Sequence, residues 1–184
     1  MTLRLNGATS GYTEIDAPAV AGSNTLVLPG GNGTAGQVLT TNGSGALSWT
    51  GMGPAFSAFQ NSQQSLTANT WTLGVFQAED FDTANCYSTS TYAFTPNVAG
   101  YYLVTGGFQI ASTSTALLTQ FYKNGSAYKT TNWLGSASAA YGSVLVYLNG
   151  ATDYMQLYFY SSVTQNTTAS AVVTYFQGHF VRPA

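Results

Sequence analysis

From residue 55 to the end, the chain is a succession of short runs rich in Tyr, Phe, Val and Thr, and turn-forming residues separate these runs. Such runs are typical of β-strands, and no stretch keeps the period of an amphipathic helix. Asn124-Gly125 stands between two of the runs, and this dipeptide favours a tight β-hairpin because both turn residues need a positive φ. The pattern predicts an all-β domain with strands near residues 56–60, 73–77, 92–95, 101–110, 116–123, 126–133, 142–148, 154–160 and 172–181.

The first 53 residues have a different character, being rich in Gly, Asn, Thr and Ala with only short apolar patches. Leu3 and Leu5 alternate before an Asn-Gly, and residues 37–40 face residues 46–49 across another, which predicts small hairpins within an extended arm. The Gly-Met-Gly-Pro at residues 51–54 indicates a hinge, because glycine adds backbone freedom and proline donates no ladder hydrogen bond. We therefore expect an N-terminal arm, residues 1–53, and a head domain, residues 54–184.

The arm has too little apolar content to bury much of itself. We therefore expect it to become ordered on a partner surface or by wrapping around sibling chains.

Charged residues make up only 5% of the chain, with four Lys and Arg against six Asp and Glu. No basic patch can neutralise several phosphates, which argues against a nucleic-acid partner. Residues 1–11 hold one arginine and no apolar run, and the longest apolar runs elsewhere are far too short to span a bilayer. We expect a protein made in the cytoplasm without a signal peptide, and no membrane insertion.

The sequence offers few groups for catalysis or metal binding. Glu79, Asp80 and Asp82 fall in an expected loop, where they could ligate Ca²⁺ or act as acid and base; an exposed acidic loop is the favoured interpretation, because calcium prefers six to eight oxygen ligands. Cys86 has no cationic neighbour in sequence and is expected to be a small buried hydrophobe. The single histidine, His179, lies in an expected strand. We therefore expect no catalytic residue, no cofactor, no metal site and no enzyme activity.

Several short sequence motifs occur along the head in a characteristic order. They are an Ala-Phe-Ser-Ala at 55–58, a Phe-Thr-Pro at 94–96, a Gly-Tyr-Tyr at 100–102, a Lys-Asn-Gly at 123–125 that follows an apolar run, and a Phe-Gln-Gly at 176–178. In order and spacing the head resembles the C1q/TNF-like domain. This resemblance implies a ten-stranded jelly-roll β-sandwich that forms a homotrimer around a threefold axis. One departure is that the family usually has Gly-Asp directly before its seventh long strand, where this chain carries an insertion at residues 149–153.

The arm carries a resemblance of its own. The segments at residues 3–7, 17–18, 21–26 and 36–45 look like stretches that are common in bacteriophage fibre and virion structural proteins. In such proteins they usually lie near fibre shafts or regions of particle attachment. The resemblance implies that the arm attaches the protein to a virion.

Alternation along three expected strands predicts a second semi-apolar face. If Phe176, Gly178 and Phe180 face the sandwich core, the residues between them must lie on the opposite side. The strands at 101–110 and 142–148 leave Tyr and Leu side chains on that side too, and large exposed patches of this kind mark protein interfaces. The predicted trimer interface comprises Tyr101, Leu103, Leu145, Tyr147, Tyr175, Gln177 and His179, of which the last three are expected to form stacked layers along the threefold axis.

Together these observations predict a non-enzymatic, homotrimeric bacteriophage virion protein: a short fibre, or a capsid decoration (cement or head-fibre) protein, whose arm attaches to other capsid or tail proteins. The alternative is the receptor-binding tip of a tail fibre, which would recognise a host surface glycan or protein. An aromatic content of 14% would suit a glycan-binding face, although strands and obligate interfaces prefer the same residues. The sequence does not decide whether the protein lies on the capsid or the tail, which host and receptor it serves, or how many copies a particle holds. It also does not decide whether the acidic residues bind a metal.

Overall fold

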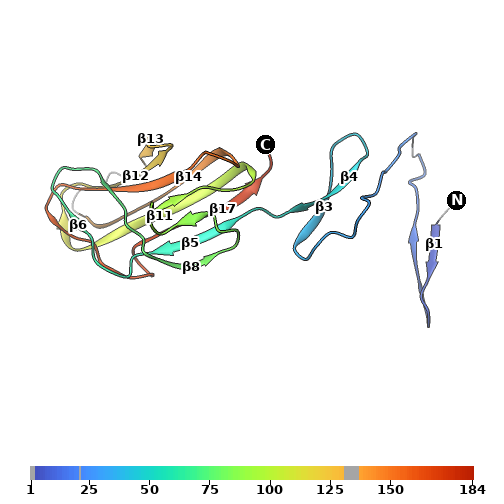
Figure 1. Ribbon diagram of the computed structural model, residues 1–184, viewed down its shortest axis with the longest axis horizontal. Coiled ribbons are helices and arrows are strands. Elements are labelled where there is room, and N and C mark those ends of the chain that lie inside the picture. Colours follow the sequence, from blue (N-terminus) through green and yellow to red (C-terminus); the bar gives the residue numbers. More distant parts are fainter. Residues whose placement is uncertain (1–2, 21, 131–136) are drawn as a thin grey trace. The chain divides into compact units, whose positions relative to one another are not determined.

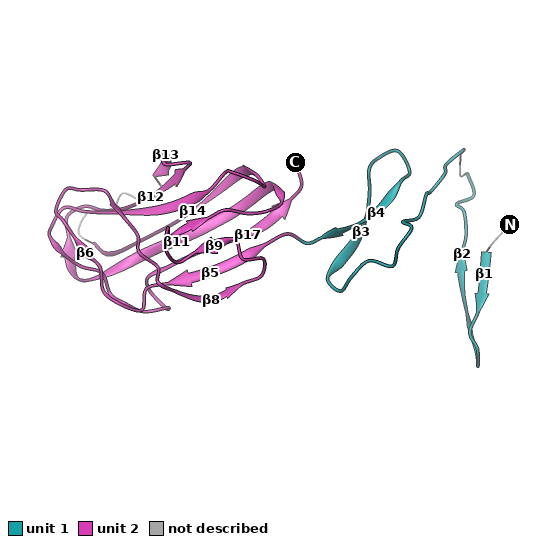
Figure 2. Ribbon diagram, in the orientation of Figure 1, with its two compact units in different colours: residues 1–52 teal, residues 53–184 magenta. Residues whose placement is uncertain are grey.

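The computed structural model describes residues 3–20, 22–130 and 137–184, and their secondary structure is entirely β (Figure 1). The chain forms two compact units, residues 1–52 and residues 53–184 (Figure 2). The division falls one residue before the expected boundary. Among the described residues, no helix meets the length and apolarity that crossing a membrane requires.

The arm consists of two antiparallel hairpins, as its Asn-Gly patterns predict. The first pairs β1 (Leu3–Asn6) with β2 (Tyr12–Ile15), and the second pairs β3 (Gln37–Thr41) with β4 (Leu47–Gly51). Val27 forms a parallel bridge to Ala46 at the start of β4, and the Trp49 indole donates a hydrogen bond of 2.8 Å to the Gly31 carbonyl. No described residue of the arm is buried, so these contacts give it local structure without a core.

The head is built from two sheets that face one another. The first sheet has the order β14 (Ala137–Asn149), β11 (Ala99–Ser114), β17 (Tyr175–Arg182), β5 (Ala55–Phe59) and β8 (Ala78–Asp82). The second has the order β13 (Ser126–Thr130), β12 (Leu117–Lys123), β15 (Met155–Ser161), β10 (Ala93–Phe94) and β9 (Tyr87–Ser88), with β7 (Thr72–Leu73) also on β15. A short ladder joins β6 (Ser65–Leu66) to β16 (Gln165–Asn166).

The core lies between the two sheets and is largely aromatic. Phe56 from the first sheet lies 4.4 Å from Phe94 of the second between ring centroids, and Phe108 lies 4.2 Å from Phe159 in the same way. Every second residue of β11 from Tyr102 to Val104, and again from Phe108 to Ile110, is fully or almost fully buried. This period of two confirms the face assignment made from the sequence.

The Asn124-Gly125 turn has the predicted conformation. Asn124 has a φ of 52° and Gly125 a φ of 76°, and they join β12 to β13. Both angles lie in the left-handed region that the hairpin needs. The hairpin prediction is therefore confirmed for the described residues, and the expected continuation of its second strand to Trp133 lies outside them.

The structure corrects the sequence interpretation at several strands. Residues 78–82 form strand β8 and not an acidic loop, because an edge strand can carry charged side chains on its solvated side. The expected strand at 73–77 shrinks to the two residues of β7, and Val172 and Val173 lie in a turn before β17. The described strands of the two sheets number five and six, where ten were expected in all.

Candidate functional site

The outer face of the five-stranded sheet, the side turned away from the core, is organised in four rows. Strand register places residues side by side across β14, β11, β17, β5 and β8, so each row runs perpendicular to the strands. The rows are Tyr147, Tyr101 and Arg182; Leu145, Leu103, His179 and Ala55; Ser143, Thr105, Gln177, Ser57 and Phe81; and Tyr141, Gly107, Tyr175 and Phe59.

The first row is aromatic. Tyr101 and Tyr147 lie opposite one another on β11 and β14, with ring centroids 5.8 Å apart and the rings inclined by 62°. The guanidinium of Arg182 lies 5.9 Å from the Tyr101 ring centroid. Edge-on aromatic pairs and a cation over a ring are both favourable arrangements, so this row holds its shape while remaining partly exposed.

The second row is aliphatic with one histidine. Leu103 lies between Leu145, which is 58% exposed, and His179, which pairs with Ala55. Beside the row is an open depression of about 310 Å³, lined by Ala55, Phe56, Phe81, Leu103, Thr105, Gln177, Gly178 and His179. The described part of this chain leaves the row accessible to a second molecule.

The third row is polar but uncharged along its centre. Thr105 lies between Ser143 and Gln177, and Gln177 pairs with Ser57. The Ser57 hydroxyl donates a hydrogen bond of 2.9 Å to the Asp80 carboxylate. The row therefore presents hydroxyl and amide groups, which can hydrogen-bond across an interface.

The fourth row packs two tyrosines over a glycine. Tyr141 and Tyr175 lie on either side of Gly107 in the ladder, with stacked rings 5.8 Å apart, and the Tyr141 hydroxyl donates 2.8 Å to the Val173 carbonyl. Burial raises the pKa of Tyr141, and the neighbouring Tyr175 adds to this effect. A β-carbon at position 107 would collide with the Ala140 carbonyl and with Tyr141, so only glycine fits beneath this pair.

The structure brings all seven residues of the predicted interface together on this one face. Sequence reasoning missed three aromatic residues of the same face, Tyr141, Phe59 and Phe81. Phe81 was missed because residues 78–82 were interpreted as a loop. A large apolar residue among acidic ones, in a run as long as a strand, is the signal that could have indicated an edge strand here. Phe81 is 51% exposed on β8.

Two of the three acidic residues, Asp80 and Asp82, accept hydrogen bonds from neighbouring protein groups. Asp82 accepts hydrogen bonds from the Tyr87 amide at 2.7 Å and the Ala84 amide at 3.2 Å, and Asp80 accepts from Ser57. Burial and the nearby Asp82 raise the pKa of Glu79. Among the described residues, no group of three or more His, Cys, Asp and Glu side chains is arranged to hold a metal ion.

Cys86 is 5% exposed and packs in the core, which confirms the expectation of a buried hydrophobe. Burial raises the pKa of its thiol. A buried thiol with a raised pKa is a poor nucleophile.

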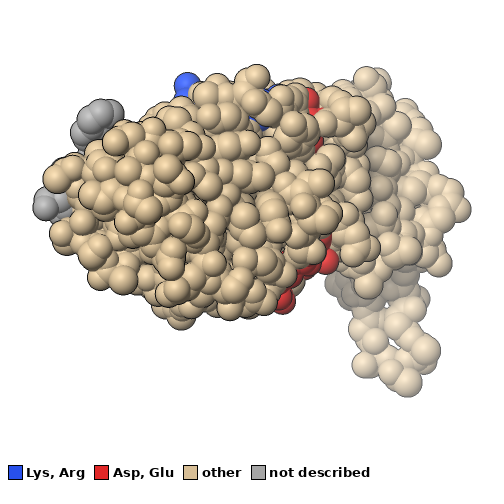
Figure 3. Space-filling view, turned by 60° about the vertical axis from the view of Figure 1, so that its left-hand side comes forward, with Lys and Arg blue, Asp and Glu red and all other residues tan. Residues whose placement is uncertain are grey.

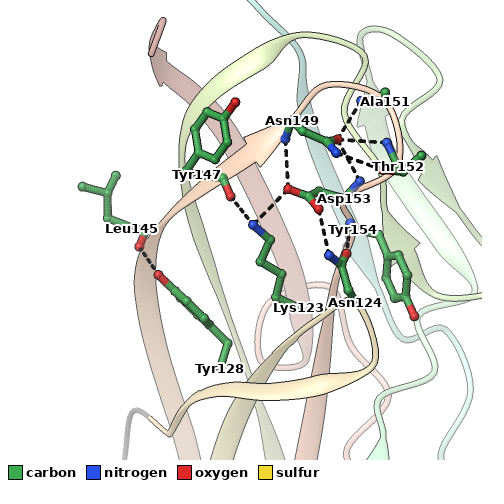
Figure 4. Close-up of polar contacts among 10 residues, drawn as sticks. All are labelled: Lys123, Asn124, Tyr128, Leu145, Tyr147, Asn149, Ala151, Thr152, Asp153 and Tyr154. Atoms are coloured by element: carbon green, nitrogen blue, oxygen red, sulfur yellow. Dashed lines mark hydrogen bonds and ion pairs between the residues drawn. The ribbon is translucent and has the colours of Figure 1, made fainter.

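The insertion at residues 149–153 forms an ordered turn at the end of β14 (Figure 4). The Asn149 side-chain oxygen accepts hydrogen bonds from the amides of Ala151, Thr152 and Asp153, at 3.0, 2.9 and 2.9 Å. Asp153 in turn pairs with Lys123 on β12. The insertion thereby ties the turn to the β12–β13 hairpin.

Side chains of the same hairpin contact the edge strand β14, whose one partner among the described strands is β11. The Lys123 ammonium donates to the Tyr147 carbonyl at 2.7 Å, and the Tyr128 hydroxyl donates to the Leu145 carbonyl at 3.3 Å (Figure 4). Side chains that occupy the carbonyls of an edge strand oppose the addition of another strand there. Two carbonyls of this edge strand are therefore already hydrogen-bonded within the chain.

Charge is sparse over the molecule. On the side drawn in Figure 3, charged atoms appear only as small separate patches in an otherwise uncharged surface. The second, third and fourth rows of the outer face contain no Lys, Arg, Asp or Glu. Such a surface favours apolar and hydrogen-bonded contacts over ion pairs.

No protein-family model and no curated protein matches the chain. Solved structures do match its fold. Eiger TNF from S. frugiperda superposes with a TM-score of 0.58 at 9% identity, covering 72% of this chain and 94% of that one. The globular domain of zebrafish complement 1qA gives 0.52 at 16%, covering 71% and 99%, and murine APRIL gives 0.57 at 8%, covering 70% and 99%. The chain therefore contains an all-β jelly roll of the C1q/TNF-like type, as its sequence motifs predict.

Proposed function

We propose that the protein is a non-enzymatic structural component of a bacteriophage virion, in which three chains associate through the outer face and the arm attaches the trimer to the particle. The trimer serves as a capsid decoration or a short fibre, with its heads directed outward. It needs no cofactor and acts by binding other virion proteins.

The arrangement of the outer face in rows is the observation that best supports the proposed association of three chains. Around a threefold axis parallel to the strands, as the C1q/TNF-like resemblance implies, each row becomes a layer in which identical residues of three chains meet. A row containing a carboxylate or an ammonium would bring like charges together, whereas rows of Leu, of Thr and Gln, or of Tyr can pack on their own copies. The residues of three of the four rows are themselves uncharged, and the Asp80 carboxylate adjoins the third row only at its β8 end, where Ser57 donates a hydrogen bond to it.

The attachment role rests on the arm. Its segments resemble those of phage fibre and virion proteins, and its large apolar side chains are exposed, including Val20 at 92%, Leu28 at 71% and Leu26 at 68%. In an isolated chain these side chains stay in water and contribute no stabilisation. A partner surface could bury them, and that burial would favour binding.

Two measurements test the proposal. Sedimentation equilibrium at micromolar concentration should give the mass of three chains, because obligate interfaces bury roughly 2,000 Å² or more and persist at that dilution. Particles of the phage that encodes the protein should contain it, and deletion of the codons for residues 1–52 should yield soluble trimer and particles without it. A monomer, or particles that retain the shortened protein, would contradict the corresponding half of the proposal.

A further inference from the structure

We infer that the first hairpin of the arm, residues 3–15, binds the same hairpin of its sibling chains, so that three copies bury one face of each hairpin against the others. This inference rests on the proposed trimer and adds a second contact between the chains, separate from the head.

The hairpin separates apolar from charged side chains completely in its strands. Register places Leu3 opposite Ile15 and Leu5 opposite Thr13 on one face, and alternation puts the remaining strand residues on the other. This separation is typical of a strand pair with one face against a partner and one face in water. We call the first the apolar face of the hairpin, formed by Leu3, Leu5, Thr13 and Ile15.

The other face is internally complete. Arg4 forms an ion pair with Glu14 at 2.7 Å, and its guanidinium carbon lies 4.0 Å from the centroid of the Tyr12 ring. Its charges are therefore already matched within one chain. The hairpin thus requires no charged partner. What remains exposed to water is its apolar face, which a partner could bury.

Nothing within the described arm covers that face. Leu3 is 58% exposed, Leu5 57% and Ile15 63%. A lone two-stranded hairpin is at best marginally stable in water, and it needs packing on one face to persist. A partner for the apolar face would supply the missing stabilisation.

The small size of the face identifies the partner as a sibling chain. Three large side chains offer far less than the roughly 800 Å² per partner that holds two free proteins together. Tethered molecules need much less contact, because linkage gives effective concentrations in the millimolar range. Chains joined by their heads are tethered in this way. Identical apolar faces are also complementary to one another, and three of them can close around an axis with their charged faces outward.

The test compares two cysteine variants of the full-length protein. Leu5→Cys places a thiol on the apolar face, and Asn6→Cys places one on the opposite face of the same strand as a matched control. After treatment with a short bis-maleimide, Leu5→Cys should give covalent dimers on a denaturing gel at least several-fold more than Asn6→Cys. The parent, whose Cys86 is 5% exposed, gives the background.

Sedimentation of the same samples separates the two proposals. A trimer in which positions 5 and 6 cross-link equally, or neither does, overturns the hairpin contact and leaves the head trimer standing; this is also the result expected if the apolar face is reserved for another virion protein. A monomer overturns both. As a second readout, Arg4 is the only Lys or Arg in residues 1–52. Trypsin should cleave after Arg4 faster in a Leu5→Ser, Ile15→Ser variant than in the parent, and equal rates would count against the contact.

Discussion

The Lys123 ammonium lies 2.9 Å from a carboxylate oxygen of Asp153, and this ion pair joins the β12–β13 hairpin to the turn after β14. Both side chains are largely removed from solvent, at 25% and 13% exposure. The Asn124 amide donates to the other carboxylate oxygen at 2.7 Å, and the Asn149 backbone amide donates to the first at 3.1 Å. Asp153 thus accepts from three donors, two in the β12–β13 hairpin and one at the end of β14.

We expect Asp153→Asn to destabilise the head by about 1–2 kcal/mol, because the partly buried carboxylate loses hydrogen bonds that water replaces only in part. The variant keeps the shape of the side chain, but it replaces one acceptor oxygen with an amide NH2 group, which is a donor facing other donors. Guanidinium unfolding at neutral pH measures the change. A midpoint equal to that of the parent would show that the cluster contributes nothing to stability.

The difference in stability between the parent and Asp153→Asn should depend on pH. The hydrogen bond from Asn124, together with Lys123 and the Asn149 amide, lowers the pKa of Asp153 below its usual value. A carboxylate with a lowered folded pKa contributes its full stability above the unfolded value of about 3.9, and loses it as the pH falls through the folded pKa. The stability difference between parent and Asp153→Asn should therefore be constant from about pH 7 to pH 5 and shrink toward about pH 2. A constant difference over the whole range would contradict this origin.

Leu103→Asp should dissociate the trimer without unfolding the head. Leu103 lies in the second row, between Leu145 and His179, and does not belong to the core. Three aspartates brought together there would be desolvated without partners, which should weaken association by at least about 100-fold. Sedimentation equilibrium measures this effect, with Val163→Asp, on the loop after β15, as a control that should stay trimeric. A Leu103→Asp trimer as tight as the parent would exclude the outer face as the interface.

Gly107→Ala should destabilise the sheet by about 1–3 kcal/mol or more, because the added methyl group meets the backbone of β14 and the Tyr141 ring. Gly178→Ala is the matched comparison on β17, where the nearest atoms are a Phe56 ring carbon at 3.0 Å and the Leu103 carbonyl at 3.2 Å. These contacts are longer than those at position 107, where the Ala140 carbonyl and a Tyr141 ring carbon would both overlap the added methyl group, so this change should cost less. Melting temperatures from calorimetry show which of the two variants is less stable. A lower melting temperature for Gly178→Ala would contradict the close approach of β14 to Gly107.

Some of the fold could be predicted because its signals are local. The Asn124-Gly125 turn, the hairpins of the arm and the buried residues of β11 all follow from contacts between residues close in sequence or from a period of two. Strand β8 could not, because Glu79, Asp80 and Asp82 disfavour a strand by propensity. Pairing with β5 and the hydrogen bonds that Asp80 and Asp82 accept override that preference.

The sequence by itself determined which side chains share a face. Alternation is a property of the extended backbone, so Tyr101 and Leu103 had to lie on one side of their strand, and Tyr175, Gln177 and His179 on one side of theirs. Only the tertiary structure decided which strands are neighbours and in what register. Tyr101 meets Tyr147, and Leu103 meets both Leu145 and His179, through pairings between residues far apart in the chain. Those pairings depend on how two whole sheets bury their apolar sides against each other, a global condition that no short segment encodes.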